Sequence, residues 1–409
     1  MAAAYRSAGA RFIAPAGAGL VARRAPRARR ADGLVGSPTL ENPRAAAARL
    51  LARIQRQDAY ANLVLASAEL SAAQAPLITE LVYGVTRMRR ALDHLIDPYV
   101  AKTPDITTHN LLRVGAYQIH IMNKPVYAAV DQTVAAAPAH QRGFVNAVLR
   151  RVADTTPVWP SEAVRLSYPD WIVQCLESDL GTAQAHGALQ QMNQPPPVTV
   201  REDGYVQDIA SQWVADLVKV QPAERVLDMC AGPGGKATAI ARCGNVEVVA
   251  ADSRPHRAAL VADNARRTAT PLVGIVAADG CHSPFLPASF DHVLIDAPCS
   301  GLGVLGRRAD ARWRISPTDV TALAKLQAEL IDAAFGLVRG GGTVVYSVCT
   351  MTAAETIAID ELVATQHPDA CAIEVTDNRW RKRSRGAQLL PQDHNTDGMF
   401  VVRYRAPHK

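Results

Sequence analysis

The chain of 409 residues lacks long apolar runs, paired cysteines and any visible secretory signal. No run of about 18 apolar residues occurs, so we expect no membrane-spanning helix. The seven cysteines stand apart without a CxxC pair, and no group of histidines and cysteines has the spacing of zinc ligands. We therefore expect free thiols and no bound metal. These absences together predict a reducing, cytoplasmic compartment.

Positive charge is concentrated at the amino terminus. Residues 1–31 hold seven of the 44 basic residues and no acid, which leaves 37 basic against 38 acidic residues elsewhere. The basic pI is therefore no proof of a nucleic-acid-binding fold. The composition of residues 1–44, rich in alanine and arginine, predicts a disordered tail. Such a tail suits a phosphate-binding arm, a mitochondrial transit peptide or a dispensable extension, and the sequence leaves these alternatives open.

The next part of the chain has a helical pattern. Apolar residues recur at helical spacing in 45–57, 110–122 and 142–153, and strand-like alternation is absent. We expect an all-helical domain over residues 45–158. Residues 159–204 then form a helical linker, which three consecutive prolines at 195–197 bring to an end.

Residues 205–409 have a different sequence pattern, in which short apolar runs alternate with helical segments. The runs cover 225–230, 246–252, 273–279, 291–296 and 342–348. Continuous apolar strands separated by helices predict an α/β fold, with a mostly parallel sheet and helices on both faces. Ligands of such folds bind at the carboxyl ends of the strands, where this sequence places acids and cysteines.

A glycine-rich turn follows the first of these strands. The stretch Gly232–Ala237 fits the G-x-G-x-x-G/A form, whereas a phosphate loop would need a glycine at Cys230 and a hydroxyl at Ala237. Asp252 and Asp279 close the next two strands, where carboxylates accept hydrogen bonds from a ribose or an adenine amine. Each aspartate has the simpler alternative of capping the following helix. Together they favour an adenosine-containing cofactor without deciding between S-adenosylmethionine and NAD.

Two cysteines end the fourth and fifth strands. Methylation of carbon 5 of cytosine requires a thiolate that adds to carbon 6, an acid at the edge of the ring and a group that releases the product. Asp296, Cys299 and Cys349 suit these needs. The alternative is that both thiols fill the core, but Pro298 and Gly301 mark an exposed turn around Cys299.

Three motifs carry a resemblance to a known family. "CAGPGGK" (230–236), "DAPCSGLG" (296–303) and "YSVCT" (346–350), in this order, resemble the RNA (cytosine-5) methyltransferases. The helical segments 78–87, 111–134 and 143–152 resemble the NusB-like domain of one subgroup, the Sun/RsmB-type enzymes, which methylate a cytosine of small-subunit (16S) ribosomal RNA. The resemblance covers about residues 45–405.

The resemblance implies a Rossmann-like methyltransferase domain behind an all-α, RNA-binding NusB-like domain, acting as a monomer on ribosomal RNA, free or partly assembled. Cys349 would be the nucleophile, Cys299 would assist product release, and Asp296 would bind the cytosine edge. Lys236 would face the catalytic pocket, unless it is merely a solvated lysine. The residues implied to hold S-adenosylmethionine are Cys230, Ala231, Gly232, Pro233, Gly234, Gly235, Lys236, Asp252, Asp279 and Asp296.

The sequence departs from the family in a minor way at "SVCT" (347–350), which replaces the more usual STCS and keeps the thiol, and in a larger way at one segment. The family usually has a substantial segment between its N-x-x-PP stretch and VQD, whereas residues 192–208 join the two almost directly. We therefore expect an RNA-recognition lobe to be largely missing and RNA affinity to be in question. Two basic clusters, 306–314 and 379–386, would compensate by phosphate contact and base stacking, unless they are solvated charged faces. The candidates in the first cluster are Arg307, Arg308, Arg312, Trp313 and Arg314.

Three alternative functions stay open. The substrate would be transfer RNA in one of them, against which the helical domain argues. The chain would be a catalytically silent RNA-binding or assembly factor in another, which the shortened segment favours and the intact pair of thiols opposes. A dehydrogenase is the third, and no hydride-transfer machinery would explain its two thiols.

Overall fold

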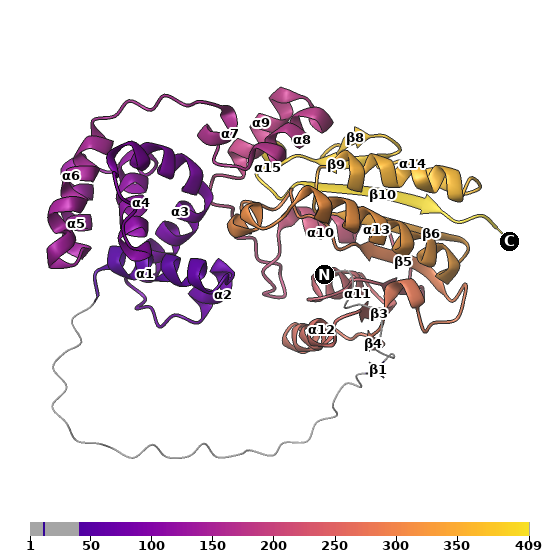
Figure 1. Ribbon diagram of the computed structural model, residues 1–409. Helices are drawn as coiled ribbons and strands as arrows, with labels where there is room; N and C mark the ends of the chain where they lie inside the picture. The colour runs from indigo at the N-terminus through magenta and orange to yellow at the C-terminus, as the bar shows by residue number, and fades with distance from the viewer. Residues whose placement is uncertain (1–10, 13–40, 409) are drawn as a thin grey trace, which may run out of the picture. The chain divides into compact units, whose positions relative to one another are not determined.

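The computed structural model of the protein describes residues 11–12 and 41–408, which form two compact units that divide between Ser167 and Tyr168 (Figure 1). Most of the predicted tail, 1–44, lies outside the described residues. Within it, Arg11–Phe12 form a short strand, β1, and Pro43 already begins the first helix. No helix of the described residues is long and apolar enough to cross a membrane.

The first unit is all-helical over its described residues, 41–167, as predicted. Its α-helices are α1 (Pro43–Arg56), α2 (Ala61–Ala66), α3 (Ala75–Ile96), α4 (Ile106–His120), α5 (Val126–Ala136), α6 (Arg142–Ala153) and α7 (Glu162–Arg165). Asn42 caps α1 and Asp105 caps α4, each by accepting a backbone N–H. Helix α4 is buried along most of its length and packs against α1, α3, α5 and α6, so it forms the centre of this unit.

The second unit is built on one sheet. Its strands are β2 (Arg225–Asp228), β3 (Glu247–Asp252), β4 (Gly274–Ala277), β5 (Phe290–Asp296), β6 (Val338–Val348), β7 (Cys371–Ile373), β8 (Arg381–Arg383), β9 (Gly386–Leu389) and β10 (Met399–Arg405). The strand order is β1-β4-β3-β2-β5-β6-β10-β9-β8, with β7 also paired to β10. From β4 to β6 the sheet is parallel, and the remaining pairs are antiparallel.

Both faces of this sheet are covered, because successive strand residues enter two different cores. On β5, Val293 and Ile295 join one core while Leu294 joins the other. Helices α10 (Ile209–Asp216), α11 (Gly235–Ala241) and α12 (Pro255–Arg267) cover the Leu294 face, and α13 (Pro317–Leu337) and α14 (Ile357–Gln366) cover the opposite face. The predicted α/β fold, with a mostly parallel sheet between helices, is confirmed. The unit is completed by α8 (Asp170–Leu180), α9 (Thr182–Gln191) and α15 (Pro391–His394).

A close helix crossing in the first unit gives a test of its packing. A Cβ atom at Gly84 of α3 would overlap the ring of Tyr117 on α4, whereas Gly143 of α6 has open space at the same position. We expect Gly84→Ala to lower the free energy of unfolding by about 1–3 kcal/mol, because the two helices must separate. Gly143→Ala is the matched control and should raise it by about 0.5–1 kcal/mol. Urea denaturation measures both, and equal effects of the two substitutions would contradict the described crossing.

Candidate active site

Three neighbouring parallel strands bring acids and thiols to one edge of the sheet. In the register, Asp228 of β2 lies beside Leu294 of β5, and Asp296 of β5 lies beside Ser347 of β6. The strands therefore end side by side, with Cys299 three residues after β5 and Cys349 directly after β6. The structure thus brings together the acid and both thiols that the sequence singled out.

The two thiols are in contact. The Sγ atoms of Cys299 and Cys349 lie 3.2 Å apart, and both side chains are half-buried. Two backbone hydrogen bonds join the turns that carry them, from Ala297 N–H to Ser347 C=O (2.9 Å) and from Gly303 N–H to Cys349 C=O (3.0 Å). The hydrogen bond to Cys349 and burial raise the pKa of Cys299 well above its ordinary value. Cys299 is therefore held in its protonated form.

Lys236 lies in the same site and is only 8% exposed, so the alternative of a solvated lysine is wrong. Its Nζ donates to Asp296 Oδ2 at 2.6 Å, and Ser347 Oγ donates to Asp296 Oδ1 at 2.9 Å. Burial lowers the pKa of Lys236, but the Asp296 carboxylate and, to a smaller extent, charge on Cys349 outweigh it, so the net shift is upward. The ammonium therefore stays charged within electrostatic reach of the Cys349 sulfur.

The glycine turn between β2 and α11 is closely packed. A Cβ atom at Gly232 would lie 2.5 Å from Asp252 Oδ2, and Gly234 has a left-handed backbone (φ 108°) at the start of α11. Asp252 accepts hydrogen bonds from Gly232 N–H and from Arg254 N–H, each at 3.0 Å. It also pairs with Arg257 of α12, Nε to Oδ2 at 3.2 Å. Only a turn without side chains permits this approach of backbone to carboxylate.

Asp279 lies differently from Asp252. It follows β4 by two residues and caps the 3-10 turn Gly280–His282, accepting from Cys281 N–H at 3.0 Å and contacting the His282 ring at 3.2 Å. Its carboxylate keeps partial exposure, so this cap leaves part of the group accessible. The capping role that the sequence offered as an alternative is therefore present at Asp279.

Sequence reasoning missed Asp228, the last residue of β2. Among the described residues, neither of its carboxylate oxygens accepts a well-formed hydrogen bond, although the side chain is buried. Burial, and then the charge of Asp296, raise the pKa of Asp228 to about 7, and the Lys236 charge and the Cys230 amide offset this only in part. A buried acid whose oxygens lack well-formed hydrogen bonds suits a cationic ligand. The available signal was its place at a strand end, which Asp252 and Asp296 share.

The predicted RNA-binding cluster is largely internal. Arg312 is wrong as an RNA contact, because its side chain is fully buried. It donates to Asn193 Oδ1 at 2.8 Å and lies 3.9 Å from the centre of the Tyr168 ring. Arg307 pairs with both Asp208 and Asp397, whereas Arg308 is exposed. Trp313 and Arg314 are half-buried, and Arg314 lies 3.6 Å from Asp310.

The second basic cluster is also occupied within the chain. Arg379 pairs with Asp377, Arg381 with Asp393 and Arg385 with Asp360, while Arg383 donates to the Asp179 carbonyl. These contacts hold β8 and the turn after it, so the cluster is not simply a solvated charged face.

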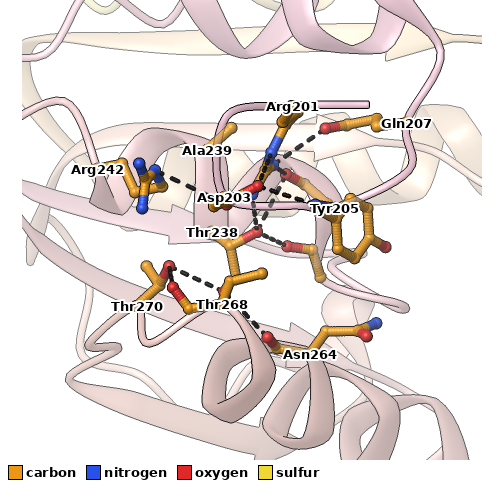
Figure 2. Close-up of polar contacts among 12 residues, drawn as sticks. Arg201, Asp203, Tyr205, Gln207, Thr238, Ala239, Arg242, Asn264, Thr268 and Thr270 are labelled. Atoms are coloured by element: carbon orange, nitrogen blue, oxygen red, sulfur yellow. Dashed lines mark hydrogen bonds and ion pairs between the residues drawn. The ribbon is translucent and has the colours of Figure 1, made fainter. Parts of the chain in front are cut away.

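The shortened segment 192–208 folds back on the glycine turn. An antiparallel bridge joins Val200 to Val206, and Arg201 between them is directed at α11 (Figure 2). Arg201 donates to the Gly235 carbonyl at 2.6 Å and to Thr238 Oγ1 at 3.1 Å, and it pairs with the buried Asp203. This ribbon therefore fixes the first turn of α11, from which Lys236 reaches the site.

Comparison with known proteins gives two family matches. The profile of the 16S rRNA methyltransferase RsmB/F family matches residues 215–405, and that of the NusB family matches residues 41–154. A putative methyltransferase of Mycobacterium tuberculosis is 34% identical over a 451-residue alignment that covers 90% of this chain and 97% of the relative. A probable ribosomal RNA small subunit methyltransferase B of Synechocystis is 30% identical over 86% of this chain and 97% of the relative.

A solved structure supports the fold. The crystal structure of the protein PH0851 superposes with a TM-score of 0.69 at 19% identity, covering 92% of this chain and 100% of that one. The sequence matches extend from the helical unit to the last strand, and they include both thiol turns. The chain belongs to the 16S rRNA methyltransferase RsmB/F family.

Proposed function

We propose that the protein transfers a methyl group from S-adenosylmethionine to carbon 5 of a cytosine in small-subunit ribosomal RNA, through a covalent bond between Cys349 and carbon 6. The observation that carries the proposal is the 3.2 Å contact between the Cys299 and Cys349 sulfurs, beside the Lys236–Asp296 ion pair. A single nucleophilic thiol would not explain this pair. Covalent addition followed by release requires two groups at the same carbon–carbon bond.

The residues around the glycine turn fit S-adenosylmethionine. Asp228 is a buried acid whose carboxylate oxygens have no well-formed hydrogen bond among the described residues, which suits the cationic end of the cofactor. Gly232 leaves no room for a side chain beside Asp252, which suits a ribose held against the turn. Arg257 holds the Asp252 carboxylate in place, and Asp279 would accept the adenine amine. When bound, the cofactor supplies an electrophilic methyl group.

The charges of the site support different roles for the two thiols. Cys349 is the sulfur whose charge acts on Lys236, so a thiolate there has a cationic neighbour. Cys299 keeps its proton because of its hydrogen bond to Cys349 and its burial. In the proposed reaction the Cys349 thiolate bonds to carbon 6 and Asp296 accepts a hydrogen bond from the exocyclic amine at the cytosine edge. The Lys236 ammonium beside Asp296 offsets the negative charge that develops on the ring. Carbon 5 then becomes nucleophilic enough to accept the methyl group.

Bond formation at Cys349 also changes Cys299. The hydrogen bond to Cys349 and the charge of that sulfur are two of the causes that raise the pKa of Cys299. Both disappear when the Cys349 sulfur becomes a thioether, so the pKa of Cys299 falls during the reaction. Cys299 can then give up its own proton to solvent water, and the resulting thiolate accepts the proton on carbon 5. The carbon 5–carbon 6 double bond forms again, and Cys349 leaves as a thiolate.

Ribosomal RNA as the substrate rests on the names of the relatives and on the NusB match. The 451-residue alignment with the mycobacterial relative is longer than this chain of 409 residues, so that relative contains segments that this chain lacks. This supports a missing lobe and keeps transfer RNA and a silent assembly factor as outcomes of the test.

We expect the protein to transfer labelled methyl groups from S-adenosylmethionine to small-subunit ribosomal RNA. Nucleoside mass spectrometry of the product should find 5-methylcytosine, and mass mapping of ribonuclease fragments should place it at one position. Transfer RNA and large-subunit RNA serve as controls and should gain no label. Label in transfer RNA alone would contradict the ribosomal substrate, and no label in any RNA would favour the silent factor.

The two thiols should respond differently to substitution. Cys349→Ala should lower methyl transfer by more than about a thousandfold, because carbon 6 then has no nucleophile. Cys299→Ala should instead accumulate a protein–RNA adduct that survives denaturing gel electrophoresis, since the proton on carbon 5 is not removed. Cys243→Ala changes an exposed thiol away from the site and is the matched control, expected to behave like the wild type. Normal turnover by Cys349→Ala would overturn the mechanism.

Cofactor affinity should depend on the charge of Asp228. Because the pKa of Asp228 is raised to about 7, the group is ionised above that pH and protonated below it. Binding of a cationic amino group needs the ionised form, so affinity for S-adenosylhomocysteine should fall as the pH drops through 7, by up to about tenfold per unit. Asp228→Asn should bind weakly at pH 8 and lose this dependence. Calorimetric titration from pH 5.5 to 8 measures both, and an unchanged profile in Asp228→Asn would assign the dependence to another group.

A further inference from the structure

The carboxylate of Glu355 is hydrogen-bonded to the turn that carries Cys299 and lies close to the turn that carries Cys349. Glu355, in the 3-10 turn Ala353–Glu355 after β6, is fully buried. Its Oε1 accepts from Ser300 N–H (2.8 Å) and from Gln327 Nε2 (3.0 Å), and its Oε2 accepts from Ser300 Oγ (2.5 Å) and from Thr352 Oγ1 (2.9 Å). Both oxygens are thus fully used, and all four donors are neutral.

These hydrogen bonds connect the two turns that carry the thiols. Ser300 is the residue after Cys299, and its hydroxyl also contacts Thr350 Oγ1 at 2.8 Å. Thr350 is in turn the residue after Cys349. One carboxylate therefore holds a residue adjacent to the first thiol, and through a single hydroxyl it reaches the residue adjacent to the second.

The surrounding core holds Glu355 itself in place. Gln327 of α13, besides contacting Glu355, donates to the Pro298 carbonyl at 2.9 Å, directly before Cys299. The single hydroxyl proton of Tyr346 on β6 is shared between Gln327 Oε1 at 3.0 Å and the Glu355 carbonyl at 2.7 Å. Helix α13 and strand β6 thus fix the network, so a movement of the Cys299 turn would break hydrogen bonds on both sides of that thiol.

A buried carboxylate is costly to retain, because burial removes it from water and no ion pair of the described residues compensates Glu355. An apolar core of the same shape would stabilise the fold equally well. Hydrogen bonds to a charged acceptor are shorter and stronger than neutral ones, and they define geometry more closely. The charge of Glu355 also contributes to the raised pKa of Cys299, after the larger effects of Cys349 and burial.

We propose that Glu355 is a positioning residue, which holds the Cys299 turn against the Cys349 turn so that one sulfur attacks carbon 6 while the other stays within reach of carbon 5. The inference rests on the proposed function. Backbone hydrogen bonds hold the loop at Ala297 and at Gly303. Between these two points, the contacts at Pro298 and Ser300 fix the position of the sulfur.

The test compares Glu355→Gln with Asp360→Asn. Asp360 of α14 is an equally buried carboxylate, paired with Arg385 and hydrogen-bonded to Tyr404, and it contacts neither thiol turn. In Glu355→Gln an amide nitrogen replaces one of two oxygens that each accept two hydrogen bonds, so two donors must turn away. We expect the single-turnover rate of methyl transfer to fall about 10- to 100-fold, with unchanged affinity for S-adenosylhomocysteine. Asp360→Asn should lower the melting temperature and keep the transfer rate.

A second measurement needs no RNA. The oxidant diamide takes up the two thiol hydrogens and leaves a disulfide. The rate of Cys299–Cys349 linkage, followed by peptide mass mapping, depends on the distance between the sulfurs and on the ionisation of Cys299. Loss of the Glu355 charge lowers the pKa of Cys299 and by itself speeds linkage, so slower linkage in Glu355→Gln reports a larger distance. We expect linkage to slow about tenfold in Glu355→Gln and to stay unchanged in Asp360→Asn. If Glu355→Gln fails to fold, Ser300→Ala and Thr352→Val each remove one donor and should slow linkage several-fold.

The two measurements separate the two proposals. A wild type that methylates no RNA would overturn the proposed function, while the linkage rates would still test Glu355. Wild-type transfer and linkage rates in folded Glu355→Gln would overturn the positioning role and leave the proposed function intact. Equal losses of transfer in Glu355→Gln and Asp360→Asn would likewise overturn it, because stability alone would then explain the effect.

Discussion

The contact between the sulfurs of Cys299 and Cys349 is the constraint on which the second unit depends. Two thiols 3.2 Å apart, on turns fifty residues apart in sequence, require that β5 and β6 be adjacent, parallel and in fixed register. A shift of one residue would turn Asp296 and Cys349 to opposite faces of the sheet. The two cores fix that register, because Val345 packs on one face while Val344 and Tyr346 pack on the other.

Three carboxylates near this contact have three different environments. Asp296 has the Lys236 ammonium, Glu355 has four neutral donors, and Asp228 has no well-formed hydrogen bond among the described residues. The hydrogen-bond and ion-pair partners of a carboxylate determine its charge and its chemical role. In the proposed function, the carboxylate paired with a cation lies at the reacting ring, the one filled by neutral donors defines geometry, and the one without well-formed hydrogen bonds suits a cationic ligand. The same functional group would thus serve substrate, scaffold and cofactor.

Sequence reasoning reached the parts that follow from local pattern. The apolar runs predict the five parallel strands and the helical first unit. The carboxyl ends of parallel strands lie at one edge of a sheet, and this rule predicts that Asp296, Cys299 and Cys349 come together. The sequence pattern predicts neither the contacts of Glu355 nor the burial of Arg312. Arg312 is enclosed by Tyr168 and Asn193, which lie more than a hundred residues earlier. Glu355 faces Ser300 across 55 residues, and no periodicity reports such a contact.

The shortened segment 192–208 has a structural role that limits its other roles. Arg201 and Asp203 are buried against the first turn of α11, so the inner face of this ribbon supports the glycine turn (Figure 2). Specific protein–nucleic acid interfaces bury on the order of 1,000 Å² or more of protein surface, which a ribbon of a few residues does not provide. Because the arginines at 307 and 312 are also held by internal partners, most of the RNA contact in the proposed function falls to other surfaces. The helical first unit, which matches the NusB family, is a candidate for this contact under the proposed function.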